Sequence, residues 1–83
     1  MNEVWNVLTY RDYDFKEESG RQVKGRTLHC YRPNRESGWP GVEYAKFSCK
    51  FGTEAYNVIP APGKPYEVVF NRFGKVQNLL PVA

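Results

Sequence analysis

Residues 42–51 read Val-Glu-Tyr-Ala-Lys-Phe-Ser-Cys-Lys-Phe and alternate between two kinds of side chain. Because successive side chains of a β-strand point to opposite faces, a period of two predicts a strand. The two faces hold Ala45, Phe47, Cys49 and Phe51 on one side and Tyr44, Lys46, Ser48 and Lys50 on the other. The first face can enter a core. The second combines a ring with ammonium groups, which are the groups that bind single-stranded nucleic acids.

The rest of the chain is long enough for one domain, which we expect to span residues 1–83. No run of 18 apolar residues is present, so no transmembrane helix is expected. The first residues, Met-Asn-Glu-Val-Trp, lack the basic and apolar regions of a signal peptide. We therefore expect a location in the cytoplasm, with no membrane partner.

Two apolar runs precede the strand predicted at 42–51, and each is expected to contain an irregularity. In the run 4–15, Val4, Leu8 and Tyr10 share one face while Trp5, Val7, Tyr13 and Phe15 share the other. A strand that is apolar on both faces often bends at a bulge. In the run 21–31, Gly25 is expected to form a bulge, so that Lys24 and Arg26 change faces relative to Leu28 and Cys30.

The later chain alternates turns with short apolar runs. Residues 32–41 contain two prolines and two glycines and predict a protruding loop. Residues 53–59 fit a helical turn or a short strand, and 60–65 form a connector rich in proline. Residues 66–71 and 75–82 are expected to be strands joined by a tight hairpin at 71–74. The predicted core contains Phe47, Cys49, Val68, Val76 and Leu80, with Val82 also facing inward.

Five short strands with little helix predict an all-β fold. The long connection after the third strand and the tight hairpin at the end favour a five-stranded OB-fold-like barrel. An SH3-like barrel is the alternative, since it also combines five strands with little helix.

The sequence contains few groups that could carry catalysis. His29 is the single histidine, and no nucleophile elbow accompanies it. Cys30 and Cys49 stand apart, without the spacing of a zinc or redox motif, and both fall at inward strand positions. We therefore expect buried thiols, no enzyme, no metal site and no cofactor.

Charge and aromatic residues instead favour an anionic partner. Residues 21–50 hold seven basic residues against Glu36 and Glu43, whereas the net charge of the whole chain is +3. Aromatic residues make up 16% of the chain, and in so small a domain some rings must be exposed. The predicted nucleic-acid-binding residues are Arg21, Lys24, Arg26, Tyr31, Arg32, Arg35, Trp39, Tyr44, Lys46, Lys50, Arg72, Phe73 and Lys75.

Several short segments resemble the small single-stranded-DNA-binding proteins of the filamentous-phage gene V type, which have an OB-fold. The segments are 18–22 (Glu-Ser-Gly-Arg-Gln), Cys30-Tyr31, Ala61-Pro62-Gly63 before 66–68 (Tyr-Glu-Val), and 79–83 (Leu-Leu-Pro-Val-Ala). The resemblance implies a symmetric dimer that coats single-stranded DNA cooperatively, with roles for Arg21, Tyr31 and Phe73. The loop 32–41, which contains Trp39, departs from that pattern.

Together these features predict a protein that coats single-stranded DNA with little sequence preference, in DNA replication of a phage or mobile element. RNA is an alternative ligand, and a homodimer is the expected assembly. The alternative function is a small phage or mobile-element module that inhibits or adapts another protein through its exposed rings. A binder of duplex DNA or RNA on an SH3-like barrel is a third possibility.

Overall fold

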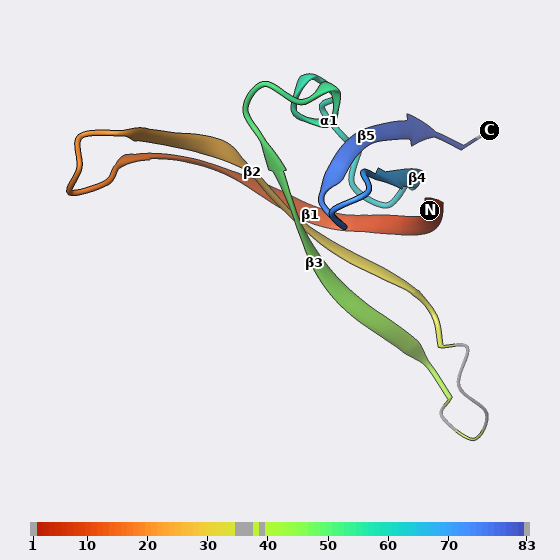
Figure 1. Cartoon of the computed structure of the whole chain (residues 1–83). Coiled ribbons are helices and arrows are strands. Elements are labelled where there is room, and N and C mark those ends of the chain that lie inside the picture. Colours follow the sequence, from red (N-terminus) through yellow and green to blue (C-terminus); the bar gives the residue numbers. More distant parts are fainter. Residues whose placement is uncertain (1, 35–37, 39, 83) are drawn as a thin grey trace.

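The computed structural model describes residues 2–34, 38 and 40–82, and it is nearly all β. The strands are β1 (Asn2–Lys16), β2 (Gln22–Pro33), β3 (Val42–Lys50), β4 (Pro65–Phe70) and β5 (Val76–Pro81). A single helical turn, α1 (Glu54–Asn57), lies between β3 and β4 (Figure 1). The five predicted strands are confirmed.

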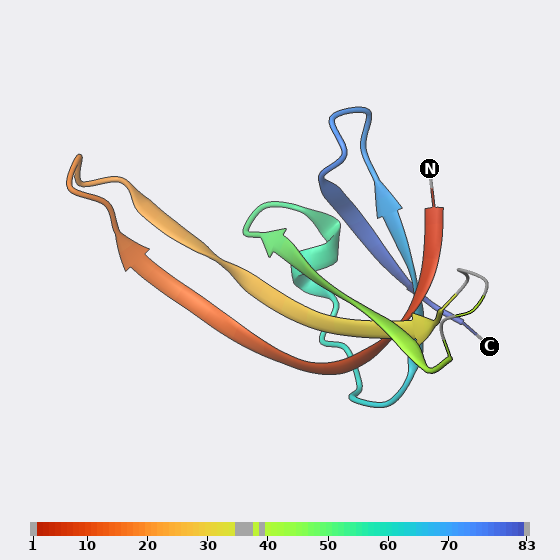
Figure 2. The same ribbon diagram turned by 90° about the horizontal axis from the view of Figure 1, so that it is seen from below.

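All five strands form one antiparallel sheet with the order β3-β2-β1-β4-β5. The sheet curves, so that α1 and the β4–β5 hairpin lie inside the bend of β1 and β2 (Figure 2). No pairing joins β3 to β5 within the described residues, and the sheet is therefore not closed into a barrel. The all-β class is confirmed, whereas the closed barrel of the OB-fold expectation is not.

The β1–β2 hairpin extends well beyond the rest of the sheet, which gives the molecule dimensions of 48 × 26 × 26 Å (Figure 1). Pairing along it runs from Asn6 opposite Tyr31 to Lys16 opposite Gln22. We call its outer half, residues 11–24, the arm.

A bulge in β1 determines which side chains face the core. The register between β1 and β2 shifts between Val7 and Thr9, which leaves Leu8 as an extra residue. Trp5 and Val7 are buried before the bulge, and Leu8 is 57% exposed. Because one inserted residue reverses the alternation, Tyr10 then packs against the core. Tyr13 and Phe15 consequently lie on the face opposite to Trp5 and Val7, which corrects their predicted grouping.

No bulge occurs at Gly25, contrary to the prediction. Gly25 pairs regularly with Tyr13 on β1 and with Lys50 on β3. The glycine is needed for space, because a Cβ atom there would lie 2.6 Å from Cζ of Tyr13 and 2.8 Å from the carbonyl oxygen of Cys49. The Tyr13 ring therefore lies directly over the Gly25 backbone. Since β2 is regular here, Arg26 keeps the inward direction of Leu28 and Cys30.

The core lies between the inner face of the sheet and α1. Its buried members are Trp5, Val7, Leu28, Cys30, Cys49, Ala55, Tyr66, Val68, Val76 and Leu79, and Phe47 is partly buried against them. Thr53 caps α1, because its side chain accepts a hydrogen bond from the backbone N–H of Tyr56. No helix in the described part of the chain is long and apolar enough to cross a membrane.

A second irregularity corrects the predicted inward face of β5. Phe70 pairs with Val76 and Val69 with Asn78, which leaves Gln77 unpaired in the ladder. The extra residue reverses the alternation, so Leu79 is buried at 1% exposure. Leu80 and Val82, both predicted to face inward, are about 40% exposed.

Candidate nucleic-acid interface

The face of β1, β2 and β3 that points away from the core carries rings and cations together. Cross-strand pairing fixes its members, because directly opposed residues of an antiparallel pair share a face. They are Asn6, Thr9, Arg11, Tyr13 and Phe15 of β1, Val23, Gly25, Thr27, His29 and Tyr31 of β2, and Val42, Tyr44, Lys46, Ser48 and Lys50 of β3. We call this surface the outer face. It contains no carboxylate.

The rings of the outer face form two small groups. On the arm, Tyr13 and Phe15 lie with their centroids 6.2 Å apart, and the Tyr13 hydroxyl lies 2.7 Å from Oγ of Ser48. Further along, the hydroxyl of Tyr44 is hydrogen-bonded to Nδ1 of His29. Phe15 and Tyr44 are 53% and 56% exposed. Exposed rings that are fixed by neighbours offer flat surfaces on which unpaired bases can stack.

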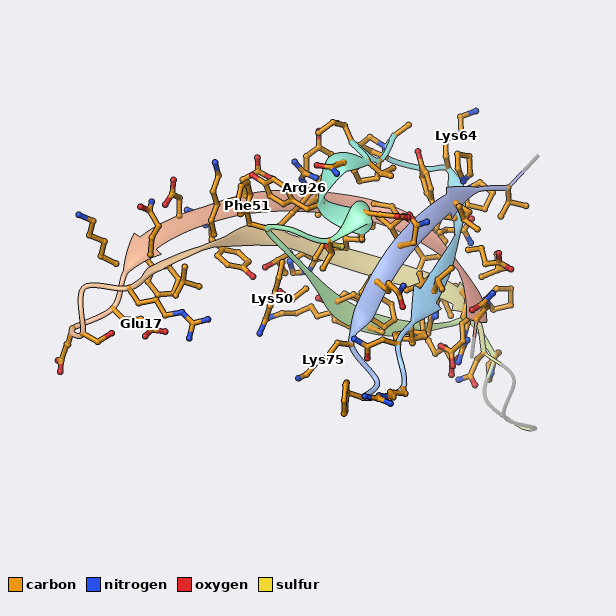
Figure 3. All side chains as sticks on the ribbon, turned by 45° about the horizontal axis from the view of Figure 1, so that its top comes forward. Glu17, Arg26, Lys50, Phe51, Lys64 and Lys75 are labelled. Carbon is orange, nitrogen blue, oxygen red and sulfur yellow. The ribbon has the colours of Figure 1, made fainter. Side chains whose placement is uncertain are left out.

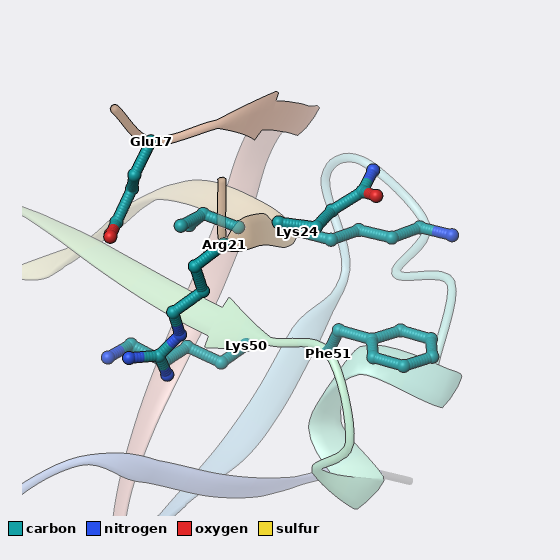
Figure 4. Close-up of a pocket in the computed structure, with 7 residues that line it drawn as sticks. Glu17, Arg21, Lys24, Lys50 and Phe51 are labelled. Carbon is teal, nitrogen blue, oxygen red and sulfur yellow. The ribbon is translucent and has the colours of Figure 1, made fainter. Parts of the chain in front are cut away.

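Cations border these rings along β3 and at the base of the arm. Lys46 and Lys50 are exposed on β3, and Arg11 is exposed on β1. Arg21, just before β2, and Lys50 both line a cavity of about 630 Å³ between the arm and the end of β3 (Figure 4). Glu17, in the turn of the arm, also lines this cavity. Lys24 is a third cation that lines this cavity. Three cations at one cavity favour a phosphate there, and Glu17 reduces the net positive charge that attracts it.

A cleft of about 440 Å³ separates the exposed edge of β3 from the β4–β5 hairpin. Lys46 and Lys50 line one side of it and Lys75 the other. In Figure 3, Lys50 and Lys75 project to the same side of the molecule and Lys64 to the opposite side. Lys75 thereby lies across the cleft from the cations of β3, although it comes from a distant hairpin.

Arg26, predicted to bind nucleic acid, is buried instead. Its side chain is 4% exposed, and its Nε donates to Asp12 at 2.7 Å. Nη1 donates to the carbonyl oxygens of Tyr56 and Val58, at 2.7 and 3.1 Å. A guanidinium with these partners ties α1 to the sheet and is not available to a phosphate. This corrects the prediction for Arg26.

Arg32 also has a structural environment. Its side chain is 15% exposed and forms ion pairs with Glu3 and Glu43. Its guanidinium carbon lies 3.9 Å from the centroid of the Trp5 ring, within the range of a cation–π contact. With two carboxylates beside it, Arg32 contributes little positive field to the outer face, and its predicted binding role stays a prediction that this environment disfavours.

Lys24, Arg72 and Phe73, which were also predicted to bind, lie away from the outer face. Lys24 points to the other face, where its ammonium lies 5.0 Å from the centroid of the Phe51 ring. Arg72 and Phe73 lie at the tip of the β4–β5 hairpin, with the guanidinium 4.9 Å from the ring, and Phe73 is 73% exposed. Arg35 and Trp39 lie outside the residues that the structure describes.

The sequence prediction missed four aromatic or basic members of the outer face: Arg11, Tyr13, Phe15 and His29. The first three stand at alternate positions, which is a strand signal that points them to one side. Unbroken alternation places these three residues on the same face as the core residues Trp5 and Val7. The extra residue Leu8 moves them to the opposite face.

The cysteines belong to the core and do not form a reactive site. Cys30 and Cys49 are free thiols with no exposed surface. Burial raises the pKa of the Cys30 thiol from its ordinary value of 9.0 to about 12, with a smaller contribution from Cys49. Burial likewise raises the pKa of Cys49 to about 11. Among the described residues, no group of three or more His, Cys, Asp or Glu side chains could hold a metal ion.

Comparisons of the chain with protein-family models, with curated proteins and with solved structures found no match. The outer face must therefore be interpreted from its own chemistry.

Proposed function

We propose that this protein binds single-stranded DNA through the outer face of β1, β2 and β3, with little sequence preference. One observation carries the proposal: aromatic and basic side chains share a face whose described members include no carboxylate. They are the rings of Tyr13, Phe15, Tyr31 and Tyr44, the imidazole of His29, and the cations Arg11, Lys46 and Lys50. Unpaired bases would stack on Phe15, Tyr13 and Tyr44, and phosphates would lie near Lys46, Lys50 and Arg21. Stacking is sequence-tolerant because every base has a flat π surface.

The geometry of the rings supports a single strand as the ligand. Stacking on a side chain requires a base whose face is free, and bases within a duplex are already stacked on one another. The rings stand on one face of a sheet. The helix in the described residues, α1, has four residues, which is too short to enter a major groove. RNA offers the same rings and phosphates, so the choice between DNA and RNA is an outcome of the binding measurement.

The main test is the salt dependence of binding to fluorescein-labelled oligo-dT, measured by polarisation. For single strands the slope of log K against log salt is about −0.7 for each phosphate neutralised. The double variant Lys46→Ala/Lys50→Ala should therefore reduce the magnitude of the slope by about 1.4. A charge-matched control is Lys16→Ala/Lys64→Ala, because Lys16 lies on the opposite face of the arm and Lys64 projects to the opposite side in Figure 3.

The two classes of function predict different results. If the DNA lies on the outer face, the salt slope becomes shallower for Lys46→Ala/Lys50→Ala and stays at the wild-type value for the control. If both variants respond equally, the cations act only as diffuse charge and the proposed site is wrong. No binding of oligo-dT at low salt would refute the function and favour a protein-interaction module. Light scattering of the same samples tests the expected homodimer.

The contribution of stacking is tested separately at Tyr44 and Phe15. Replacing either ring with leucine keeps an apolar side chain but removes the flat surface. Each replacement should weaken oligo-dT binding by about 1–3 kcal/mol with an unchanged salt slope. Phe73→Leu, at the tip of the β4–β5 hairpin, is the control ring outside the outer face. A loss at Phe73 equal to that at Tyr44 would contradict the assignment.

A further inference from the structure

Strand β3 has one edge without a partner. It lies at one end of the sheet order, and only its β2 side is paired in the residues that the structure describes. An edge strand presents backbone N–H and C=O groups that can pair with another chain. Natural edges are usually protected by charges or covering segments, and here three exposed polar residues, Lys46, Ser48 and Lys50, alternate along the edge strand.

The free edge borders the cleft between β3 and the β4–β5 hairpin. The floor of this cleft is apolar: Phe47 and Phe70 meet edge to face with centroids 5.7 Å apart, and Val76 lies beside them. Its rim is cationic, with Lys46 and Lys50 on one side and Lys75 on the other. None of the described residues that line it carries a carboxylate.

These features together define a ligand. A strand added to β3 would continue its alternation, so that every second side chain faces the apolar floor near Phe47. The intervening side chains would stand opposite Lys46 and Lys50, where acidic residues form favourable cross-strand pairs. A nucleic acid can match the lysines but cannot supply the alternating donors and acceptors that a peptide backbone offers to a strand edge.

We propose that this cleft binds an extended acidic peptide segment of a partner protein, which pairs with β3 as an additional strand. The segment alternates apolar and acidic residues over about five positions, opposite residues 46–50. At about 3.3 Å per residue it would span roughly 13 Å of the edge. This inference does not rest on nucleic-acid binding, although Lys46 and Lys50 border both surfaces. A bound peptide would therefore compete with a single-stranded nucleic acid on the outer face.

The test uses the acetylated and amidated peptide Glu-Val-Glu-Val-Glu, added at millimolar concentration to the ¹⁵N-labelled protein. We expect amide shifts at residues 46–50 and 70–76 and none at the tip of the arm. The peptide Lys-Val-Lys-Val-Lys, with the same apolar residues and reversed charge, should produce no shifts. The variant Lys75→Glu, which changes the rim opposite β3, should weaken binding of the acidic peptide at least several-fold.

Two N-methylated forms of the acidic peptide separate strand pairing from simple charge attraction. N–H groups of adjacent residues point to opposite edges of a strand, so methylation of the glutamates and methylation of the valines block different edges. Strand addition requires that only one of the two forms loses binding. Equal binding of both forms would overturn the proposal.

The same samples distinguish this inference from the proposed function. If oligo-dT shifts the cleft amides and the acidic peptide does not, the cleft belongs to the nucleic-acid surface and the peptide proposal is wrong. If the peptide binds as expected and oligo-dT does not bind, the cleft is confirmed and the proposed function is refuted.

Discussion

Replacing Arg26 with methionine should destabilise the protein strongly without directly altering the outer face. Arg26 is buried with its charge satisfied by Asp12 and by the carbonyl oxygens of Tyr56 and Val58. Its guanidinium also lies 4.8 Å from the centroid of the Tyr56 ring. Methionine fills similar space but donates no hydrogen bond. Both carbonyl groups and the Asp12 carboxylate then lose their partner.

The magnitude follows from these contacts. Hydrogen bonds from a charged donor contribute about 1.5–3 kcal/mol each, and two of them reach the carbonyl oxygens of Tyr56 and Val58. The pair with Asp12 adds little, because the Asp12 side chain is 59% exposed. We expect a loss of about 3–5 kcal/mol, in line with the removal of one partner of a buried ion pair. A domain of this length has a total stability of about 4–12 kcal/mol, so the loss is a large part of it.

Urea denaturation followed by tryptophan fluorescence measures this loss. With an m-value of about 1.5 kcal/mol/M, the midpoint should fall by about 2–3 M. Lys46→Met is the matched control, because it makes the same replacement on the exposed outer face. Its midpoint should change by less than about 0.5 M, in keeping with a surface substitution. Arg26→Lys, which keeps the charge but offers a single ammonium for three acceptors, should fall between the two.

Binding adds an independent measurement. Under conditions where Arg26→Met is folded, it should bind oligo-dT with the salt slope of the wild type. For Lys46→Met the magnitude of the slope of log K against log salt should fall by about 0.7. If Arg26→Met kept the wild-type midpoint and lost slope, the guanidinium would act at the surface and the structural role assigned to it would be refuted.

Three further predictions concern the fold. Gly25→Ala should lower the free energy of unfolding by about 1–3 kcal/mol, because its Cβ would approach the Tyr13 ring and the Cys49 carbonyl; an unchanged melting temperature would contradict this. Arg32→Ala should cost about 2 kcal/mol, through loss of Glu3, Glu43 and the Trp5 ring, while the salt slope of oligo-dT binding stays the same. The thiols of Cys30 and Cys49 should resist Ellman's reagent in the native protein. Because folding raises both pKa values above 9.0, the thiols' contribution to stability is complete below pH 9 and falls as pH rises toward 11–12. Urea midpoints at pH 8 and 10 should therefore differ more for the wild type than for Cys30→Ala, and equal differences would contradict the assignment.

The strands could be predicted from the sequence because their signal is local. Alternation in 42–51, together with glycine and proline between runs, determines where a strand begins and ends. The β3 prediction of 42–51 differs from the observed Val42–Lys50 by one residue. The short helical turn at Glu54–Asn57 falls within 53–59, where a turn was one of two expected states.

The partners of Arg26 could not be predicted, because they come from three separate parts of the chain. Asp12 lies opposite it on β1, and the two carbonyl oxygens belong to residues 56 and 58 at the end of α1. In the sequence, Arg26 is a cation beside Lys24 in a basic segment, which is the usual pattern of a solvated face. Burial of a charge is decided by tertiary contacts, and strand alternation gives no information about them.

The bulge at Leu8 explains why the predicted grouping of Tyr13 and Phe15 with Trp5 and Val7 was wrong. It also explains how the outer face acquires its rings. Without the extra residue, the face that buries Trp5 and Val7 would continue through Tyr13 and Phe15. Two large rings would then point toward the core side of the arm, where no apolar residue of another strand faces them. The bulge instead turns Tyr13, Phe15 and Arg11 to the side that Tyr44, Lys46 and Lys50 occupy on β3. A regular β1 could supply a core or a ring-bearing outer face, and the inserted residue allows one strand to supply both.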